Sequence, residues 1–287
     1  MRLSHNRGDI ESILGFRSKK YTGCNMVLSF IVGGILTIIF YGILFPFYSL
    51  GKFNLINMFF HGGVYQRSII PYFIVFFSMW TLAILFIKFQ KIKLQKKALN
   101  LNILPSDSDD FVLSQTTAND IINNLYAAVD NPRRFLILNR MERALANLQN
   151  IGRISDVAET LESQAVIDEQ YTESTYTIAK GFIWAIPVMG FIGTVLGLSV
   201  AIGGFGSVLS VEFSPDKLKD SLTEVTGGLA VAFETTLIAL VAALFIQVIL
   251  TFINNYEEDF LDSCSDYCHK NIIARLRTIG SEDDLKY

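Results

Sequence analysis

The chain has 287 residues, of which 51% are hydrophobic and 18% are charged, and its mean hydropathy is +0.39. Soluble proteins carry about 25% charged residues, so this composition excludes an ordinary soluble domain and indicates an integral membrane protein. The net charge of -3 also excludes a broadly basic nucleic-acid-binding protein, because duplex binding needs clustered Lys and Arg to displace counterions.

The residues before the first apolar run do not read as a cleavable signal peptide. About 25 mixed polar residues come first, and the run is longer than the 7 to 15 residues of a signal-peptide core. We therefore predict a cytoplasmic N-terminal segment over residues 1–25, followed by a membrane helix that is retained.

Four apolar stretches are long enough to cross the hydrocarbon core of a bilayer, which takes about 20 residues as a helix. They lie at about 26–50, 69–89, 181–205 and 227–250. Two shorter links, 51–68 and 206–226, join these stretches in pairs, and we expect the first to be a loop; the second contains Pro215 and several charges. The sequence predicts an all-α integral membrane protein with four transmembrane helices, the third and fourth of which extend into a cytoplasmic helical domain.

Basic residues beside the spans predict the orientation, because short cytoplasmic flanks hold the excess of Lys and Arg. They precede the first span and follow the second: Arg17, Lys19, Lys20, Lys88, Lys91, Lys93, Lys96 and Lys97. Both termini and the long middle segment are then cytoplasmic. The predicted location is the bacterial inner membrane, with the two short links facing outside.

These elements divide the chain into five predicted parts. They are a cytoplasmic N-terminal segment (1–25), the first and second transmembrane helices (26–89), a cytoplasmic helical domain (90–180), the third and fourth transmembrane helices as a channel core (181–254), and a cytoplasmic helical tail (255–287).

The predicted cytoplasmic domain begins with a link and continues as helices. The sequence LPSDSDD at 104–110 is typical of a turn or flexible link. Apolar residues then recur at helical spacing on both sides of Asn131-Pro132, which predicts a helical hairpin that ends near Ile151-Gly152. From about Ser155 onward nothing breaks the helix, so we expect one rod that runs into the third span. The tail to about residue 278 also lacks helix breakers.

The third predicted span contains a run of small residues with one proline. Its members are Pro187, Gly190, Gly193, Thr194 and Gly197. Small residues at intervals of three or four let membrane helices approach closely. Pro187 removes a backbone hydrogen bond, which a membrane tolerates where neighbours or water satisfy the freed carbonyl. The run indicates either helix packing alone or packing beside a hinge or water path.

The fourth predicted span places Glu234, Thr235 and Thr236 inside an apolar stretch. A carboxylate there costs about 2.5 to 3.5 kcal/mol and normally faces a bundle interior, a water-filled cavity or a partner. Glu234 lies about 200° around the helix from Thr236, so the two do not line one narrow pore. Thr236 either lines an ion path or bonds its own preceding carbonyl. Glu234 either handles ions or pairs with a polar group on another helix.

A family resemblance rests on these two spans. The third-span run, followed by Gly228, Ala230, Ala232 and Thr236, resembles the paired signature of the MotA/TolQ/ExbB proton-channel family. The motif likeness covers about 179–254, whereas the first half is similar in layout only. The four-span order and the large middle segment resemble the flagellar-stator branch of that family. The charged torque-helix pattern of that branch is not recognisable in this sequence.

The resemblance implies an assembly and roles for individual residues. Members of the family form a homopentamer around two copies of a single-span partner of the MotB, ExbD or TolR kind, whose membrane Asp carries the ion. Thr194 and Thr236 are then expected to form the ion path for H+ or Na+, and Pro187 to act as a gating or hinge residue. Helix packing is expected of Gly190, Gly193, Gly197 and Gly228. The family's early fourth-span glutamate falls at Val231 here, so Glu234 is expected to be an ion-path residue or an intersubunit contact.

Other groups of polar residues carry less information. No nucleotide-binding loop, nucleophile elbow or carboxylate pair is present, so we predict no enzyme, no catalytic residue and no cofactor. Cys264, Cys268 and His269 lack a fourth ligand at a recognised spacing, so no metal site is predicted. These two cysteines and Cys24 are expected to be reduced. Five charged residues lie close together in the sequence and form either a docking face or an ordinary solvated face. They are Arg133, Arg134, Arg140, Glu142 and Arg143.

The leading hypothesis is an ion-conducting stator subunit of an inner-membrane rotary motor, which couples proton or sodium flow to mechanical work. Two alternatives stay open. One is a non-conducting membrane scaffold packed through its small residues. The other is a specialised member of the same family that serves anti-phage defence or gliding.

Overall fold

The computed structural model describes residues 3–50, 54–60, 69–101, 115–151, 154–209 and 215–275. Within these ranges the chain is helical, and its only bridge of strand type pairs Leu3 with Val129. Four helices are long and apolar enough to cross a membrane: α3 (Met26–Ser49), α5 (Ile70–Leu99), α9 (Thr177–Leu209) and α10 (Pro215–Asn271). The all-α, four-span prediction is confirmed, and the chain is a multi-pass membrane protein.

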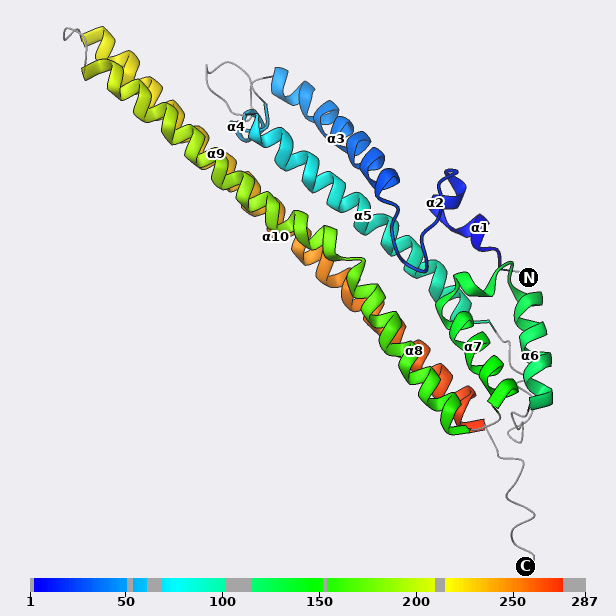
Figure 1. The fold of residues 1–287 in the computed structure, drawn as a ribbon. Coiled ribbons are helices and arrows are strands. Elements are labelled where there is room, and N and C mark those ends of the chain that lie inside the picture. The colour runs from blue at the N-terminus through cyan, green and yellow to red at the C-terminus, as the bar shows by residue number, and fades with distance from the viewer. Residues whose placement is uncertain are drawn as a thin grey trace, which may run out of the picture. The chain divides into compact units, whose positions relative to one another are not determined.

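The chain folds into two compact units. The first contains Met1–Asn25, Phe86–Tyr176 and Phe252–Tyr287, and the second contains Met26–Leu85 and Thr177–Thr251. Helices α5 and α10 each run through both units without a break (Figure 1).

In the second unit, α3 packs against α5 at a close approach between Gly33 and Trp80. A Cβ added at Gly33 would lie 2.6 Å from the Trp80 Cα, so only glycine fits. The Trp80 indole Nε1 donates a hydrogen bond to the Ser29 hydroxyl at 3.1 Å. The Trp80 ring also lies 4.6 Å from the Phe182 ring of α9. One tryptophan therefore joins three helices of this unit.

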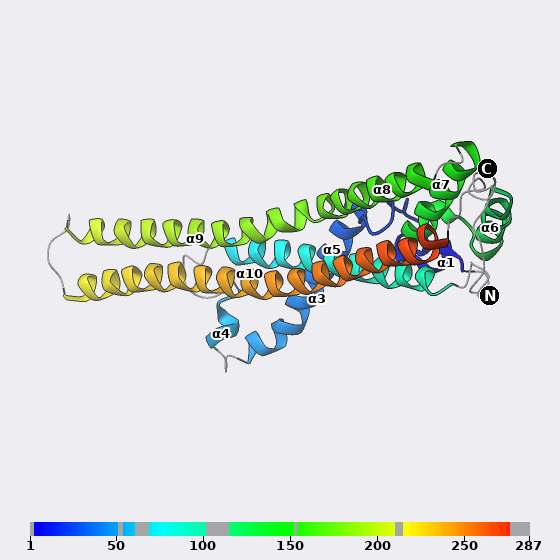
Figure 2. The same cartoon turned by 90° about the horizontal axis from the view of Figure 1, so that it is seen from below.

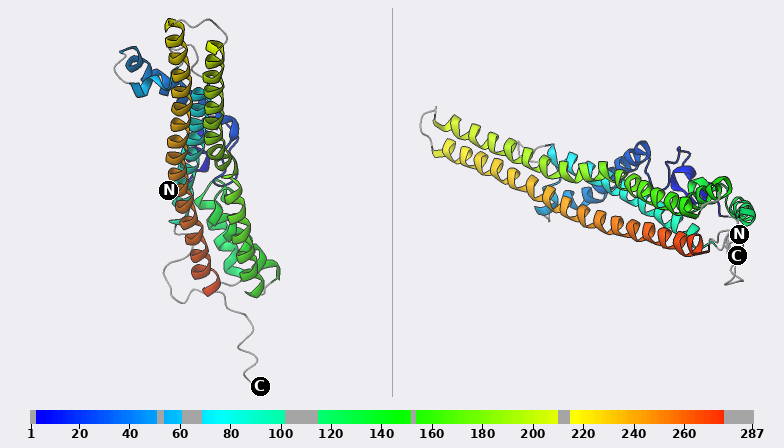
Figure 3. Two further views of the ribbon diagram at one scale, coloured as in Figure 1. Left: turned by 90° about the vertical axis from the view of Figure 1, so that its left-hand side faces the viewer. Right: turned by 60° about the horizontal axis from the view of Figure 1, so that its bottom comes forward.

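Helices α9 and α10 form an antiparallel pair in the second unit, as Figures 2 and 3 show. Both extend further into the 206–226 link than the sequence indicated. The predicted link at 206–226 is helical over most of its length, because α9 continues to Leu209 and α10 begins at Pro215. Proline at a first helical position has a preset φ, and no glycine interrupts the helix before Gly227. The predicted loop at 51–68 likewise contains a short helix, α4 (Asn54–Asn57).

In the first unit, α6 (Gln115–Ala128) and α7 (Leu136–Ile151) form the predicted helical hairpin, which is confirmed. The short helix η1 (Pro132–Arg134) joins them, and the Asn131 side chain caps it by accepting a bond from the Arg133 N–H. The cap explains why Asn131-Pro132 ends one helical pattern and starts another. The predicted link at 104–110 lies outside the described residues.

The predicted rod from the cytoplasmic domain into the third span is interrupted. Helix α8 (Ile154–Ser174) ends in a turn at Thr175 and Tyr176 before α9 begins. The Ser174 and Thr175 hydroxyls each bond a carbonyl three residues back, both at 2.6 Å. Such local side-chain bonds compete with the helix and favour a break in this Ser- and Thr-rich stretch.

The N-terminal segment is folded onto the first unit and contains two short helices, α1 (His5–Gly8) and α2 (Ile10–Ile13). The Glu11 carboxylate accepts a bond from the Lys91 ammonium at 2.6 Å and from two backbone N–H groups, those of Lys19 and Asn25. The Asp130 carboxylate accepts the His5 backbone N–H at 3.0 Å. Residues that precede the first span are thus held by ion pairing and hydrogen bonds.

His5 makes the attachment of α1 dependent on pH. Its side chain is buried against the Phe135 ring, and burial lowers the pKa of His5 below its ordinary value. The docked segment therefore binds fewer protons than the released one, so docking is favoured above about pH 6.5 and is weakened as pH falls through the lowered pKa. We expect faster amide hydrogen exchange in α1 at pH 5.5 than at pH 7.5, after correction for intrinsic rates.

A His5→Gln variant, which cannot titrate, is the control and should show the same corrected exchange at both pH values. Equal corrected exchange in the unaltered protein at pH 5.5 and 7.5 would contradict the prediction.

Candidate functional site

The contact between α9 and α10 consists of small residues that face one another at each helical turn. We call it the α9–α10 seam, and its facing pairs are Gly190 with Ala239, Gly193 with Thr235, Gly197 with Ala232, and Ala201 with Gly228. A Cβ added at Gly197 would lie 2.7 Å from the Gly228 carbonyl oxygen, which belongs to the backbone and cannot swing away. The structure thus places the four predicted packing glycines, Gly190, Gly193, Gly197 and Gly228, in one helix contact.

Thr194 and Thr236 meet at one backbone carbonyl of this seam. The Thr236 hydroxyl donates to the Gly190 oxygen across the helix pair at 3.1 Å. The Thr194 hydroxyl lies 3.4 Å from the same oxygen and 2.6 Å from the Phe191 oxygen. Both side chains are half-buried at the edge of the seam. Because a hydroxyl that donates its proton to a carbonyl keeps its lone pairs, the pair presents oxygen acceptors at one point of an apolar helix pair.

Thr235, rather than Thr236, is the most buried hydroxyl of this stretch, and sequence reasoning missed its role. Its side chain is 1% exposed and fills the space opposite Gly193. Its hydroxyl bonds the carbonyls of Val231 and Ala232 on its own helix. The period of the helix was a usable signal, because Thr235 shares a face with Gly228, Ala232 and Ala239. Thr235 therefore packs the helices, and Thr236 stays half-exposed at the seam's edge.

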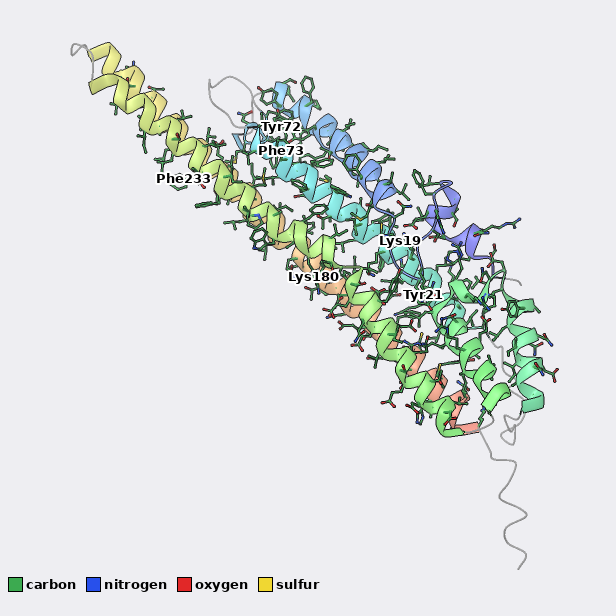
Figure 4. The ribbon with its side chains drawn as sticks, in the orientation of Figure 1. Lys19, Tyr21, Tyr72, Phe73, Lys180 and Phe233 are labelled. Atoms are coloured by element: carbon green, nitrogen blue, oxygen red, sulfur yellow. The ribbon has the colours of Figure 1, made fainter. Side chains whose placement is uncertain are left out.

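Pro187 and Glu234 lie outside this hydroxyl pair. Helix α9 continues through Pro187, whose missing N–H leaves the Ile183 carbonyl without its usual helical partner. Glu234 is half-buried, whereas Val231, one turn earlier, is buried. The neighbouring Phe233 is 65% exposed and projects from α10 (Figure 4). The carboxylate and the two hydroxyls are thus separate features of the second unit.

A model of the MotA/TolQ/ExbB proton channel family matches residues 129–265. This segment, 137 of the 287 residues, matches the MotA/TolQ/ExbB family. The match contains α7, α8, α9 and most of α10, and so includes every residue of the seam. Searches of curated proteins and of solved structures found no match to the chain. That family is a family of proton channels rather than of enzymes.

The arginines at 133 and 140 do not form a common docking face. Arg140 is 2% exposed, and its Nε lies 2.7 Å from the Asp168 carboxylate while its Nη1 donates to the Ser265 hydroxyl. Arg133 is 72% exposed and pairs with Glu142 at 3.0 Å. The sequence predicted that these charged residues form either a docking face or a solvated face. Both predictions are wrong for Arg140, because its contacts with α8 and α10 bury it.

These two arginines provide a matched test of stability. Arg140→Ala leaves the Asp168 carboxylate buried without its ion pair, which is expected to cost about 3 to 5 kcal/mol of unfolding free energy. Arg133→Ala removes an ion pair whose arginine is 72% exposed and leaves Glu142 its bond from the Tyr126 hydroxyl, so it should cost less than about 1 kcal/mol. Denaturation followed by intrinsic fluorescence in detergent measures both.

The double variant Arg140→Met, Asp168→Leu removes both charges and should recover most of the loss. Equal effects of Arg140→Ala and Arg133→Ala would show that the buried ion pair does not stabilise the fold.

A second buried ionic cluster contains Lys88, one of the basic residues that flank the spans in the sequence. The Lys88 ammonium lies 2.7 Å from the Glu257 carboxylate, and each side chain is 1% exposed. The Tyr176 hydroxyl donates to the same Glu257 oxygen at 2.6 Å, and the Lys88 ammonium lies 4.1 Å from the centre of the Tyr176 ring. No local sequence signal shows this pairing, because α5, the α8–α9 turn and α10 each supply one member.

The Cys264, Cys268 and His269 side chains do not converge. Both thiols are buried, and His269 on the same helix is exposed. Among the described residues no group of three or more His, Cys, Asp or Glu side chains is placed to hold a metal ion.

Proposed function

We propose that the chain is an ion-conducting subunit of a rotary motor in the bacterial inner membrane, with both termini in the cytoplasm. Five copies form a ring around two copies of a single-span partner of the MotB, ExbD or TolR kind. Flow of H+ or Na+ past the ring turns it about the partner and so performs mechanical work. The match of residues 129–265 to the MotA/TolQ/ExbB proton channel family supports this proposal.

The observation that carries the proposal is the meeting of Thr194 and Thr236 at the Gly190 carbonyl. Hydroxyl and carbonyl oxygens are the ligands that hard cations prefer, and they also accept hydrogen bonds from a protonated carboxyl group or from hydronium. A membrane Asp of the partner, placed beside this pair, loads and releases its ion there, while the two hydroxyls coordinate Na+ or hydrogen-bond to the water that carries H+. Pro187, seven residues before Thr194 on α9, gives that helix a place to bend during each step.

Exposed apolar residues of α9 and α10 supply the surface that a ring and a bilayer cover. They include Trp184, Phe191, Phe233, Leu244 and Phe252. Large exposed apolar side chains on a membrane helix pack against lipid or against protein. Glu234 then lies either in the ion path or between neighbouring copies, and Glu234→Gln separates these roles. A ring that assembles but stays still assigns it to the ion path, and a ring that falls apart assigns it to the subunit contact.

Purification from native membranes tests the assembly. Native mass spectrometry is expected to give five copies of this 32.2 kDa chain with two copies of a small protein that has one apolar span containing Asp. Liposomes that hold the complex should then take up H+ or Na+. A monomer without such a partner would contradict the motor and favour the non-conducting scaffold, for which the small residues of the seam would serve packing alone.

A further inference from the structure

The α9–α10 seam brings the helices close together without selecting one axial register. Its facing residues are Gly, Ala or Thr at every turn. A slide of α10 by one turn, about 5.4 Å, places small residues against small residues again, so the packing changes little. Some other contact must make one register preferred.

The axial register decides whether the Thr236 hydroxyl meets the Thr194 hydroxyl at the Gly190 oxygen. In the observed register the Thr236 hydroxyl reaches the Gly190 oxygen at 3.1 Å. After a slide of one turn the same hydroxyl lies about 5 Å further along the helix, beyond hydrogen-bond reach. One neutral hydrogen bond is a weak means of excluding such a slide.

The buried cluster of Lys88, Tyr176 and Glu257 can fix one axial register, which the packing of small residues in the seam cannot do. Glu257 accepts bonds from the Lys88 ammonium at 2.7 Å and the Tyr176 hydroxyl at 2.6 Å. Lys88 also donates to the Thr175 hydroxyl at 2.7 Å. Tyr176 directly precedes α9, and α10 is unbroken from Pro215 to Asn271. An axial slide of α10 would therefore carry Glu257 away from both of its donors.

The cluster is poorly suited to a role in stability alone. The second Glu257 oxygen, Oε1, is buried and has no hydrogen-bond partner among the described residues. Buried ion pairs can often be replaced by apolar side chains without loss of stability, and their best-attested use is to specify register. An unsatisfied buried oxygen adds a further cost, which an apolar replacement would remove.

We propose that Lys88, Tyr176 and Glu257 form a register pin, which sets the axial position of α10 against α9 and thereby positions Thr236 beside Gly190. The three residues are positioning residues and do not contact the ion. Their importance for transport rests on the proposed function, whereas the register itself can be measured independently.

Cysteine cross-linking reads the register directly. Ile186 and Ala243 are buried and come one turn further along the seam from Gly190 and Ala239, so a cysteine pair at 186 and 243 reports the observed register. A pair at 186 and 239 reports a slide of one turn. Because a disulfide needs Cβ atoms about 3.5 to 4.5 Å apart, each pair forms in one register only. Mass spectrometry of the linked peptides identifies the bonds.

The main variant is Lys88→Met, Tyr176→Phe, Glu257→Met, which replaces the pin by apolar side chains of similar size. We expect its melting temperature to equal or exceed that of the unaltered chain, and we expect the 186–239 disulfide to appear beside the 186–243 one. Ion flux should fall roughly tenfold or more, the change that corresponds to loss of one contact in the transition state. The matched control is Arg140→Met, Asp168→Leu, which removes a different buried ion pair and should leave the single register.

Tyr176→Phe alone is the second variant, because it deletes one hydroxyl and leaves the fold intact even if the triple variant does not fold. It should also permit the 186–239 disulfide. If both variants keep only the 186–243 disulfide, the pin does not set the register and the proposal is wrong. If the triple variant fails to fold, the same result for Tyr176→Phe alone leads to the same conclusion. If the slipped disulfide appears but the unaltered complex carries no ion, the register pin stands and the proposed function fails.

Discussion

Thr236→Val is expected to lower ion flux through the reconstituted complex by about ten- to a hundredfold while the ring and its partner stay assembled. Valine has nearly the shape of threonine but lacks the hydroxyl that donates to the Gly190 oxygen at 3.1 Å. Loss of one hydroxyl contact to a charged species is worth about 1.5 to 3 kcal/mol, and each 1.36 kcal/mol is tenfold in rate. Thr194→Val should act in the same direction, because its hydroxyl lies at the same carbonyl.

The matched control is Thr251→Val, the same change on the same helix. The Thr251 hydroxyl is exposed and bonds the Gln247 carbonyl of its own helix at 3.0 Å. Flux is measured with an ion-sensitive dye inside liposomes that contain the complex, and assembly is measured by native mass spectrometry. Unchanged flux in both Thr236→Val and Thr194→Val would remove the two hydroxyls from the ion path.

Gly197→Ala is expected to destabilise the α9–α10 pair by about 1 to 3 kcal/mol, the usual cost of overpacking a tight contact. The added methyl group would lie 2.7 Å from the Gly228 oxygen and 2.9 Å from the Ala232 nitrogen, both backbone atoms. The helices must therefore move apart, which also draws Thr236 away from Gly190. A lower melting temperature in detergent and a lower ion flux are the expected results.

Gly203 on the same helix is the matched control, since nothing lies within 4 Å of a Cβ added there. Gly203→Ala should raise the unfolding free energy by about 0.5 to 1 kcal/mol, because alanine loses less backbone freedom than glycine on forming a helix. Similar melting temperatures for the two variants would contradict the close approach of the helices at Gly197.

The family and the span pattern could be recognised in the amino-acid sequence because both depend on local patterns. An apolar run of sufficient length is a property of one segment, and it correctly predicted α3, α5, α9 and α10. The order of small residues and threonines in the last two spans is also local, and the family match over residues 129–265 contains it. The predicted ends of these helices were less accurate, because a helix continues past its apolar run until a break such as the turn at Thr175.

The partners of buried charges were hidden because pairing joins distant segments. Lys88 and Lys91 have the composition of a membrane flank, yet one pairs with Glu257 and the other with Glu11. Arg140 sits in a charged stretch that reads as solvent-exposed, and its partner Asp168 comes from another helix.

The membrane class, the four spans and the family thus follow from the amino-acid sequence, since apolar length and motif order are carried by continuous segments. The roles of the threonines follow only from the folded chain, in which Thr235 packs against Gly193 while Thr236 and Thr194 share the Gly190 carbonyl. Adjacent threonines differ by about 100° around a helix, so their roles depend on where the neighbouring helix lies. That position is set by contacts between segments far apart in the chain, which no local pattern contains.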